Sequence, residues 1–153
     1  MRLTVAAVGK PRNAALAEAI RDYETRAARY WPLDVQEVRE EKSSAGNSQL
    51  VRDREGERLL EKVGLARIVA CHTGGKSFTS EKFAHWLRDQ RERDHDTAFV
   101  VGGAFGLSDR LLDAASMKLS LAPWTLPHEL ARLVLAEQLY RAGSIVRGEP
   151  YHK

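Results

Sequence analysis

The chain has 153 residues, and its composition excludes several classes of protein. Hydrophobic residues make up 43% and charged residues 29%, which is typical of a globular protein and excludes a disordered or collagen-like chain. The formal net charge of +3 is compatible with nucleic acid binding but does not require it. We find neither an apolar run near the ~20 residues of a membrane helix nor a signal h-region. Cys71 is the single cysteine, which agrees with a reducing compartment, so we expect a cytoplasmic protein.

The first part of the chain predicts strands alternating with helices. We expect strands at Leu3–Val8 and Leu33–Val38 and helices at Asn13–Tyr30 and Gln49–Val63. Pro32 stops the first helix, because the residue before a proline is pushed out of the helical region. The polar segment 40–49 predicts a loop, a place where binding segments and flexible segments are both found.

The second part repeats this alternation. We expect strands at Ala66–Ala70, Ala98–Val101 and Lys118–Leu121, and helices at Ser80–Arg93, Ser108–Ala115 and His128–Val146. Residues 73–75 (TGG) break the first of these strands, and Ser80 and Ser108 are candidate helix caps. The alternation predicts an α/β fold in one domain, residues 1–153, with a mostly parallel sheet covered by helices on both faces.

Three loops are the candidate ligand site. In parallel sheets ligands bind beyond the carboxyl ends of the strands. This places the loops after Ala70, Val101 and Leu121 at one site, and their sequences are CHTGGK, GGAFGLS and APWTLPH.

The last helix carries two apolar stripes. One consists of Leu130, Leu133 and Val134, and the other of Leu135, Leu139, Ala142 and Val146. One stripe suffices to cover a sheet, so the second packs on something else. A second copy of the chain and a neighbouring helix of the same chain both remain open as that surface.

Several motifs resemble known sites but lack their required spacing. Gly75-Lys76-Ser77 is not a P-loop, because that motif needs a glycine where Ala70 stands. Residues 102–106 read G-G-x-x-G instead of the dinucleotide pattern G-x-G-x-x-G, and a tight turn is the simplest interpretation. The histidines show no pair at metal spacing and there is no CxxC, so we expect no metal. For Cys71 we expect a small apolar role.

Two further segments each allow two interpretations. The proline-bracketed loop Trp124–Glu129 has a fixed backbone that suits a flat polar ligand such as adenine, and it is also a normal helix start. The C-terminal residues Glu149–Lys153 read as a frayed tail. They also contain a tyrosine, a histidine and a lysine, which suit stacking on a base, proton transfer and phosphate binding.

Taken together, these segments resemble the RlmH type of SPOUT methyltransferase over essentially the whole chain. The segments that carry the resemblance are LTVAAVGK, DREGERLL, GGK, VVGGAFGLSD, SLAPWTLPHELARLVLAEQLYRA and the terminal PYHK. The resemblance implies methylation of N3 of a pseudouridine in 23S ribosomal RNA, with S-adenosylmethionine as cofactor. It also implies a C-terminal trefoil knot and a homodimer with cofactor sites near the subunit interface, which favours the second copy as the surface beneath the extra stripe.

The resemblance also assigns site residues. The implied cofactor contacts are Cys71, Gly103, Ala122, Pro123, Trp124, Thr125, Leu126 and Pro127. The family usually has Leu-Asp where this chain has Cys71-His72, so a side-chain contact from that acid is lost here.

The matches to LYRA and PYHK place three residues on the RNA side. We expect Arg141 to hold a phosphate or the developing negative charge, Tyr151 to position the base and His152 to help remove the N3 proton. Glu137 orients Arg141. Methyl transfer from a sulfonium is an in-line displacement, so it needs alignment of the reacting atoms and neither a metal nor a covalent enzyme intermediate.

The chain has no separate RNA-binding module, so we expect it to recognise an assembled ribosome surface. Two alternatives remain open at this point. One is a methyltransferase acting on another RNA, such as transfer RNA, and the other is a non-catalytic ribosome-associated factor that keeps the fold as a scaffold.

Overall fold

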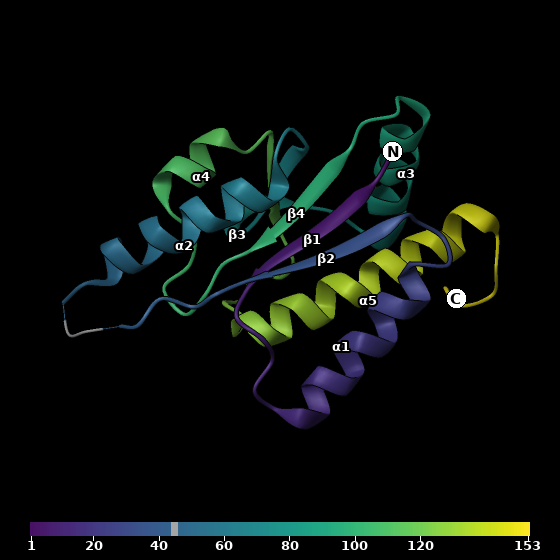
Figure 1. The fold of residues 1–153 in the computed structure, drawn as a ribbon. Helices are drawn as coiled ribbons and strands as arrows, with labels where there is room; N and C mark the ends of the chain where they lie inside the picture. Colours follow the sequence, from purple (N-terminus) through teal and green to yellow (C-terminus); the bar gives the residue numbers. More distant parts are fainter. Residues whose placement is uncertain (44–45) are drawn as a thin grey trace.

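The structure is a computed structural model that describes residues 1–43 and 46–153 (Figure 1). Its centre is a five-stranded parallel sheet with the strand order β2-β1-β4-β3-β5. The strands are β1 (Leu3–Val8), β2 (Leu33–Val38), β3 (Arg67–Ser77), β4 (Thr97–Val101) and β5 (Met117–Ser120). The helices are α1 (Ala14–Ala27), α2 (Ser48–Val63), α3 (Ser80–Glu92), α4 (Asp109–Ala114) and α5 (His128–Arg147).

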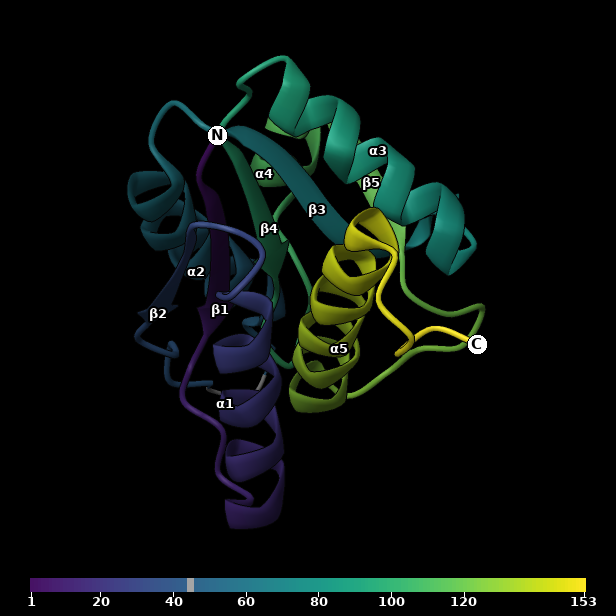
Figure 2. The ribbon, with the colours of Figure 1, turned by 90° about the vertical axis from the view of Figure 1, so that its right-hand side faces the viewer.

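Helices cover both faces of the sheet, as the sequence predicts. Figure 2 shows α1, α5 and α3 on one face and α2 and α4 on the other. Each strand serves both layers, because successive side chains point to opposite faces. In β1, Leu3 and Val5 pack under α1, α3 and α5, whereas Ala6 and Val8 pack under α2 and α4. Burial on both faces explains why β1 (LTVAAV) and β4 (TAFVV) are short and almost entirely apolar.

The predicted bounds of the first strands are confirmed, and three other predictions need correction. The first helix ends at Ala27 and not at Tyr30, because residues 28–31 form a turn that buries Trp31. The indole N–H of Trp31 donates to the carbonyl oxygen of Leu139, 2.9 Å away, and this buried contact ties the turn to α5. The cap of α3 is Thr79 and not Ser80: the Thr79 hydroxyl accepts from the backbone N–H of Lys82.

The third correction concerns β3. Residues 73–75 do not end this strand, which continues to Ser77 along β5 with a shift of register between Cys71 and Lys76. Gly75 permits the close pairing, since a Cβ there would lie 2.5 Å from the carbonyl carbon of Lys118. The Ser108 cap of α4 is confirmed, and its hydroxyl accepts from the backbone N–H of Leu111.

The two stripes of α5 differ in burial. Leu135, Leu139 and Ala142 are buried in the core with α1 and α3. The stripe of Leu130, Leu133 and Val134 is only partly covered, and Leu130 is 36% exposed. The predicted polar loop 40–49 includes residues 44–45, which lie outside the described residues. No helix in the described part of the chain is both long and apolar enough to span a bilayer.

Candidate functional site

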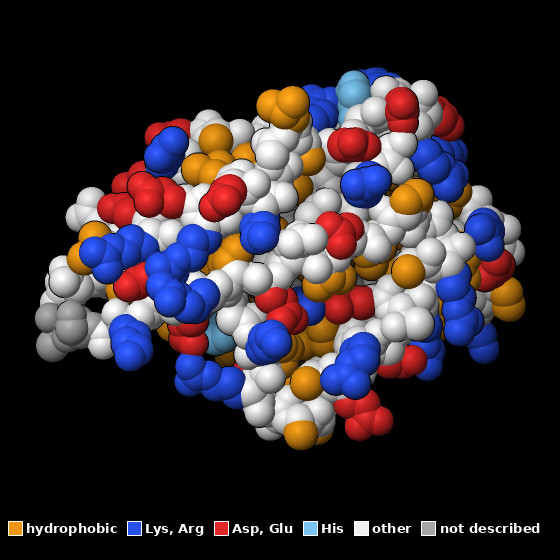
Figure 3. Space-filling model, in the orientation of Figure 1, with side chains coloured by type: hydrophobic (Ala, Val, Ile, Leu, Met, Phe, Trp, Pro, Cys, Tyr) orange, Lys and Arg blue, Asp and Glu red, His pale blue; other side chains and the backbone are white. Residues whose placement is uncertain are grey.

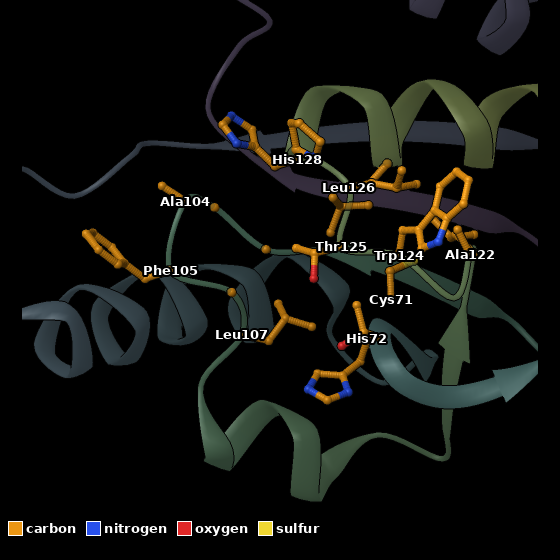
Figure 4. A pocket seen from close by; sticks show the side chains of 18 residues that line it. Cys71, His72, Ala104, Phe105, Leu107, Ala122, Trp124, Thr125, Leu126 and His128 are labelled. Carbon is orange, nitrogen blue, oxygen red and sulfur yellow. The ribbon is translucent and has the colours of Figure 1, made fainter.

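The three predicted loops meet at the carboxyl edge of the sheet and enclose a hollow of about 680 Å³ (Figure 4). They lie together because β3, β4 and β5 run parallel: the loops after β4 and β5 leave the sheet at one edge, and residues 71–76 are the irregular part of β3 where its register along β5 shifts. The predicted cofactor residues that line the hollow are Cys71, Gly103, Ala122, Trp124, Thr125, Leu126 and Pro127. Pro123 belongs to the same loop but does not line it.

The loop after β4 is a tight turn that only glycines permit. A Cβ on Gly102 would lie 2.7 Å from the carbonyl carbon of Gly106, and Gly106 has a φ of +81°. The Gly106 N–H donates to the Gly103 carbonyl oxygen at 3.0 Å, which closes the turn. A Cβ on Gly103 would come within 2.8 Å of Oε2 of Glu55 on α2. Because Gly102, Gly103 and Gly106 have no side chains, this turn exposes backbone atoms at the wall of the hollow.

The loop between β5 and α5 has a constrained backbone and an exposed indole. The Ser120 hydroxyl donates to the carbonyl oxygen of Ala122 at 2.8 Å, and Pro127 precedes the first turn of α5. Trp124 is 78% exposed, although part of it lines the hollow. The loop thus offers fixed backbone groups and an aromatic ring that its own chain does not bury.

Cys71 and His72 stand where the family usually has Leu-Asp. Burial among protein atoms raises the pKa of the Cys71 thiol to about 12, so this residue stays neutral and supplies an apolar surface. His72 Nδ1 accepts from the backbone N–H of Gly74 at 3.0 Å. The neutral His72 ring therefore carries its hydrogen on Nε2.

The predicted RNA-side residues form a second cluster around Glu137. Oε1 of Glu137 accepts from Nη2 of Arg141 at 2.5 Å and from the Tyr151 hydroxyl at 3.0 Å. The Arg141 guanidinium lies 4.7 Å from the centroid of the Tyr151 ring. Burial, the Tyr23 hydroxyl and Glu137 raise the pKa of Tyr151 well above its ordinary value, so the phenol stays protonated. Glu137 thus orients Tyr151 as well as Arg141.

His152 has both ring nitrogens engaged. Its Nδ1 lies 3.3 Å from Nη1 of Arg141, and its Nε2 lies 2.8 Å from Oε1 of Glu81 at the start of α3. Arginine can only donate, so Nδ1 is the acceptor and Nε2 carries the hydrogen that Glu81 accepts. The backbone N–H of Glu81, the His152 ring and the Thr79 hydroxyl lower the pKa of Glu81 to about 2. His152 can take a proton only at Nδ1, once Arg141 has turned away.

The two groups of predicted residues lie apart on one chain. Ala131 on α5 lines the hollow, whereas Arg141, Tyr151 and His152 do not. Arg141 is ten residues beyond Ala131 on the helix, which corresponds to about 15 Å. One chain therefore contains both groups without bringing them together.

Sequence reasoning missed two residues of this second cluster. Tyr23 on α1 lies 3.4 Å from the Tyr151 hydroxyl, and Glu81 contacts His152 from 71 residues away in the chain. Neither belongs to a motif that marks it. Across residues 1–43 and 46–153, no group of three or more His, Cys, Asp or Glu side chains is arranged to hold a metal ion.

Comparisons with known proteins agree on one family. A family model described as "Predicted SPOUT methyltransferase" matches residues 1–152. "Ribosomal RNA large subunit methyltransferase H" of Gemmatimonas aurantiaca is 56% identical over the full length of both chains, and a protein of the same name from Anaeromyxobacter sp. (strain Fw109-5) is 48% identical over the full length.

Solved structures support the fold at much lower identity. TrmJ from Z. mobilis superposes with a TM-score of 0.50 at 14% identity, covering 100% of this chain and 73% of its own. The crystal structure of a protein described only as hypothetical gives a TM-score of 0.55 at 13% identity, covering 95% of this chain and 81% of its own. These two likenesses concern the fold alone.

Proposed function

The chain belongs to the SPOUT methyltransferase family, and from this premise we propose that it methylates N3 of a pseudouridine in 23S ribosomal RNA within the assembled ribosome. The family membership makes it an S-adenosylmethionine-dependent enzyme and implies a C-terminal trefoil knot. The observation that carries the rRNA assignment is the full-length relative at 56% identity, a large-subunit rRNA methyltransferase. The finer assignment, to the assembled ribosome and to N3 of a pseudouridine, rests on the match of LYRA and PYHK at residues 139–142 and 150–153 to the RlmH pattern.

We propose that the hollow of about 680 Å³ holds S-adenosylmethionine. The fit rests on bare backbone at Gly103 and on the constrained loop Ala122–Pro127, which suit a flat adenine and a ribose. Cys71 supplies an apolar part of the wall. Pro123 does not line the hollow, and its role is to restrict the backbone of the loop that does. When bound, the cofactor supplies a methyl group on a sulfonium, which is electrophilic without a metal.

The chain's own residues then have to prepare the nucleophile. N3 of the target base carries a proton. Nδ1 of His152 can accept this proton once Arg141 has turned toward the RNA. Arg141 then holds the negative charge that develops on the base, and Tyr151, protonated and oriented by Glu137, positions the base. Glu81 keeps the hydrogen of the His152 ring on Nε2.

We propose a homodimer in which the tail of one protomer completes the hollow of its partner. The separation of about 15 Å along α5 supports this, because a single chain keeps the two groups apart. Leu130, 36% exposed, and the partly covered Leu133 and Val134 supply an apolar surface at the same end of α5 as the hollow. In a two-fold dimer the same patch serves both copies.

We also propose that one domain, residues 1–153, recognises a surface of the assembled ribosome in the cytoplasm. The net charge of +3 is modest for an enzyme that has to select one nucleotide. Shape and the combined face of two protomers would then contribute much of the selectivity, with a moderate dependence on salt.

The test uses isotopically labelled S-adenosylmethionine and ribosomes that lack the modification. We expect label on one 23S pseudouridine, located by mass spectrometry of nuclease fragments, and less or none on protein-free rRNA. Label on transfer RNA instead would move the target to another RNA. Cofactor binding without transfer to any of these RNAs would favour a non-catalytic factor and overturn the proposal.

A further inference from the structure

Glu55 of α2 is a buried carboxylate with one oxygen left unpaired. The residue is 2% exposed, and its Oε1 accepts from the backbone N–H of Glu41 at 3.0 Å. Its Oε2 has no hydrogen-bond partner among residues 1–43 and 46–153. Buried carboxylate oxygens are normally paired, so this oxygen needs a physical explanation.

The unpaired oxygen faces the wall of the larger hollow from behind. A Cβ on Gly103 would lie 2.8 Å from Oε2 of Glu55 and 3.4 Å from its Cδ, so the carboxylate points its free oxygen at this glycine. Gly103 lines the larger hollow and Glu55 does not. The backbone of Gly103, which has no side chain, thus lies between the free oxygen and the hollow.

This arrangement places the carboxylate within electrostatic reach of a ligand without any contact. A ligand atom that touches Cα of Gly103 lies within about 8 Å of Oε2, since van der Waals contacts are about 4 Å long and a carbon–carbon bond is about 1.5 Å long. Salt screens buried charges much less than exposed ones. The ionised Glu55 side chain therefore attracts a cationic group that lies against Gly103.

The groups around Glu55 do not neutralise it. Burial and the carboxylates of Glu40 and Glu41 raise the pKa of Glu55, while the Glu41 backbone N–H and Arg58 lower it. Arg58 bonds to the Glu41 carboxylate instead of to Glu55. A cation that enters the larger hollow would lower the pKa of Glu55 further, because an opposite charge favours the ionised form.

Given the proposed cofactor site, on which this inference rests, we propose that Glu55 makes the larger hollow selective for S-adenosylmethionine over its product, S-adenosylhomocysteine. The two molecules differ by one methyl group and by the positive charge that this group places on the sulfur. A negative charge behind Gly103 stabilises the bound sulfonium and leaves the neutral thioether almost unaffected. Glu55 thus favours the replacement of product by fresh cofactor.

The first test measures the Kd of both molecules by calorimetry in wild type and in Glu55→Gln. Glutamine keeps the shape of the side chain and an oxygen for the Glu41 N–H, but it removes the charge. We expect the Kd for S-adenosylmethionine to rise about fivefold or more, as the loss of one charge at about 8 Å implies, and the Kd for S-adenosylhomocysteine to stay within about twofold.

Glu57→Gln is the matched control on the same helix. The Glu57 side chain is 67% exposed. Figure 3 shows Lys and Arg side chains gathered with acidic ones over the N-terminal half of α2, where solvent screens each charge. This variant should bind both molecules like wild type.

A second measurement uses the wild-type protein. Carboxyl NMR follows the titration of Glu55, whose signal is identified by its raised pKa and by its absence in Glu55→Gln. Binding of S-adenosylmethionine should lower this pKa, and binding of S-adenosylhomocysteine should leave it nearly unchanged, because the effects of the cation and the proton on each other are reciprocal. A residue that only supports the Gly103 turn would respond to both molecules alike.

Gly103→Ala separates the selectivity of Glu55 from the position of the cofactor site. Its added Cβ acts by shape and should raise both Kd values. If it raises neither, the larger hollow is not the cofactor site and the role of Glu55 falls with it. If it raises both while Glu55→Gln changes neither, or changes both equally, only the selectivity of Glu55 is overturned. None of these measurements requires transfer of a methyl group to RNA, which tests the proposed function by itself.

Discussion

Nε2 of His152, the next-to-last residue, lies 2.8 Å from Oε1 of Glu81 in the first turn of α3. This contact attaches the C-terminal tail to a helix on the same face of the sheet as α5 (Figure 2). It also sets which ring nitrogen of His152 carries the hydrogen, so that Nδ1 faces Arg141. The tail of this chain is therefore docked and oriented rather than frayed.

The Glu81 contact predicts a pH-dependent stability. The pKa of Glu81 is lowered to about 2, below its ordinary value of 4.5. A carboxyl group whose pKa is lowered in the folded protein stabilises the fold at pH values above its ordinary pKa. This stabilisation is lost as the pH falls toward the lowered pKa. We expect Glu81→Gln to lower the urea midpoint of unfolding at neutral pH. The difference in midpoint between this variant and wild type should shrink as the pH falls from about 4.5 to about 2. Glu92→Gln, exposed on the same helix, should match wild type throughout, and a constant Glu81→Gln difference would contradict this assignment.

Replacing His152 or Arg141 by alanine tests the RNA-side cluster. Each change should lower kcat roughly 100-fold or more, the usual contribution of a positioned acid–base group or charge. The Kd for S-adenosylmethionine should stay within about twofold of wild type, since both residues are assigned to the RNA and the proton transfer and not to the cofactor. Arg88→Ala, an arginine of α3 outside the cluster, serves as the control. Near-normal kcat in both variants would remove these roles.

Gly103→Ala tests the turn that faces the cofactor. The added Cβ would meet Oε2 of Glu55 at 2.8 Å and Cγ1 of Val8 at 3.1 Å, and both belong to buried residues that have little room to shift. We expect a loss of about 1–3 kcal/mol in the free energy of unfolding, as in other overpacked interiors. Calorimetry should also give a weaker affinity for S-adenosylmethionine, while Ala114→Ser, exposed on α4, should change neither quantity. Unaltered cofactor affinity in Gly103→Ala would separate this turn from the cofactor site.

Mixing two impaired variants tests whether each site is shared between subunits. A His152→Ala protomer has an impaired tail and an intact hollow, whereas a Gly103→Ala protomer has an impaired hollow and an intact tail. If tail and hollow come from different chains, half of the sites in each mixed dimer are intact. Random assortment makes half of the dimers mixed, so activity should return to about one quarter of the wild-type value. Activity that stays at the level of the separate variants would mean that each chain uses its own tail.

The sequence predicts the first two strands well, because β1 is a short apolar run that ends at a glycine and β2 alternates apolar and polar residues directly after Pro32. β1 and β2 have the predicted bounds, Leu3–Val8 and Leu33–Val38. The error at β3 has a tertiary cause. Gly74 and Gly75 are local signals for a break, but the pairing of Lys76 with Leu119 on β5 keeps the chain extended. The end of α1 was similarly decided by the burial of Trp31 against α5.

The sequence by itself determined the α/β class, the mostly parallel sheet and the three segments that line the larger hollow, but not the order of the strands. The reason is that parallel strands place all their carboxyl ends at one edge, whatever the details of packing. It also determined the family, through segments such as TLPHELARLVLAEQLYRA (residues 125–142) and PYHK (residues 150–153).

Only the tertiary structure decided which side chains meet across the fold. The pairing of Glu81 with His152 and the position of Glu55 under Gly103 join residues that are far apart in the sequence and belong to no shared motif. Only the packed chain reveals that Ala131 of α5 lines the larger hollow and that Arg141, Tyr151 and His152 do not, because this depends on where the loops and the tail come to rest. Such contacts follow from how helices and loops pack on the sheet, which local propensity and periodicity do not encode.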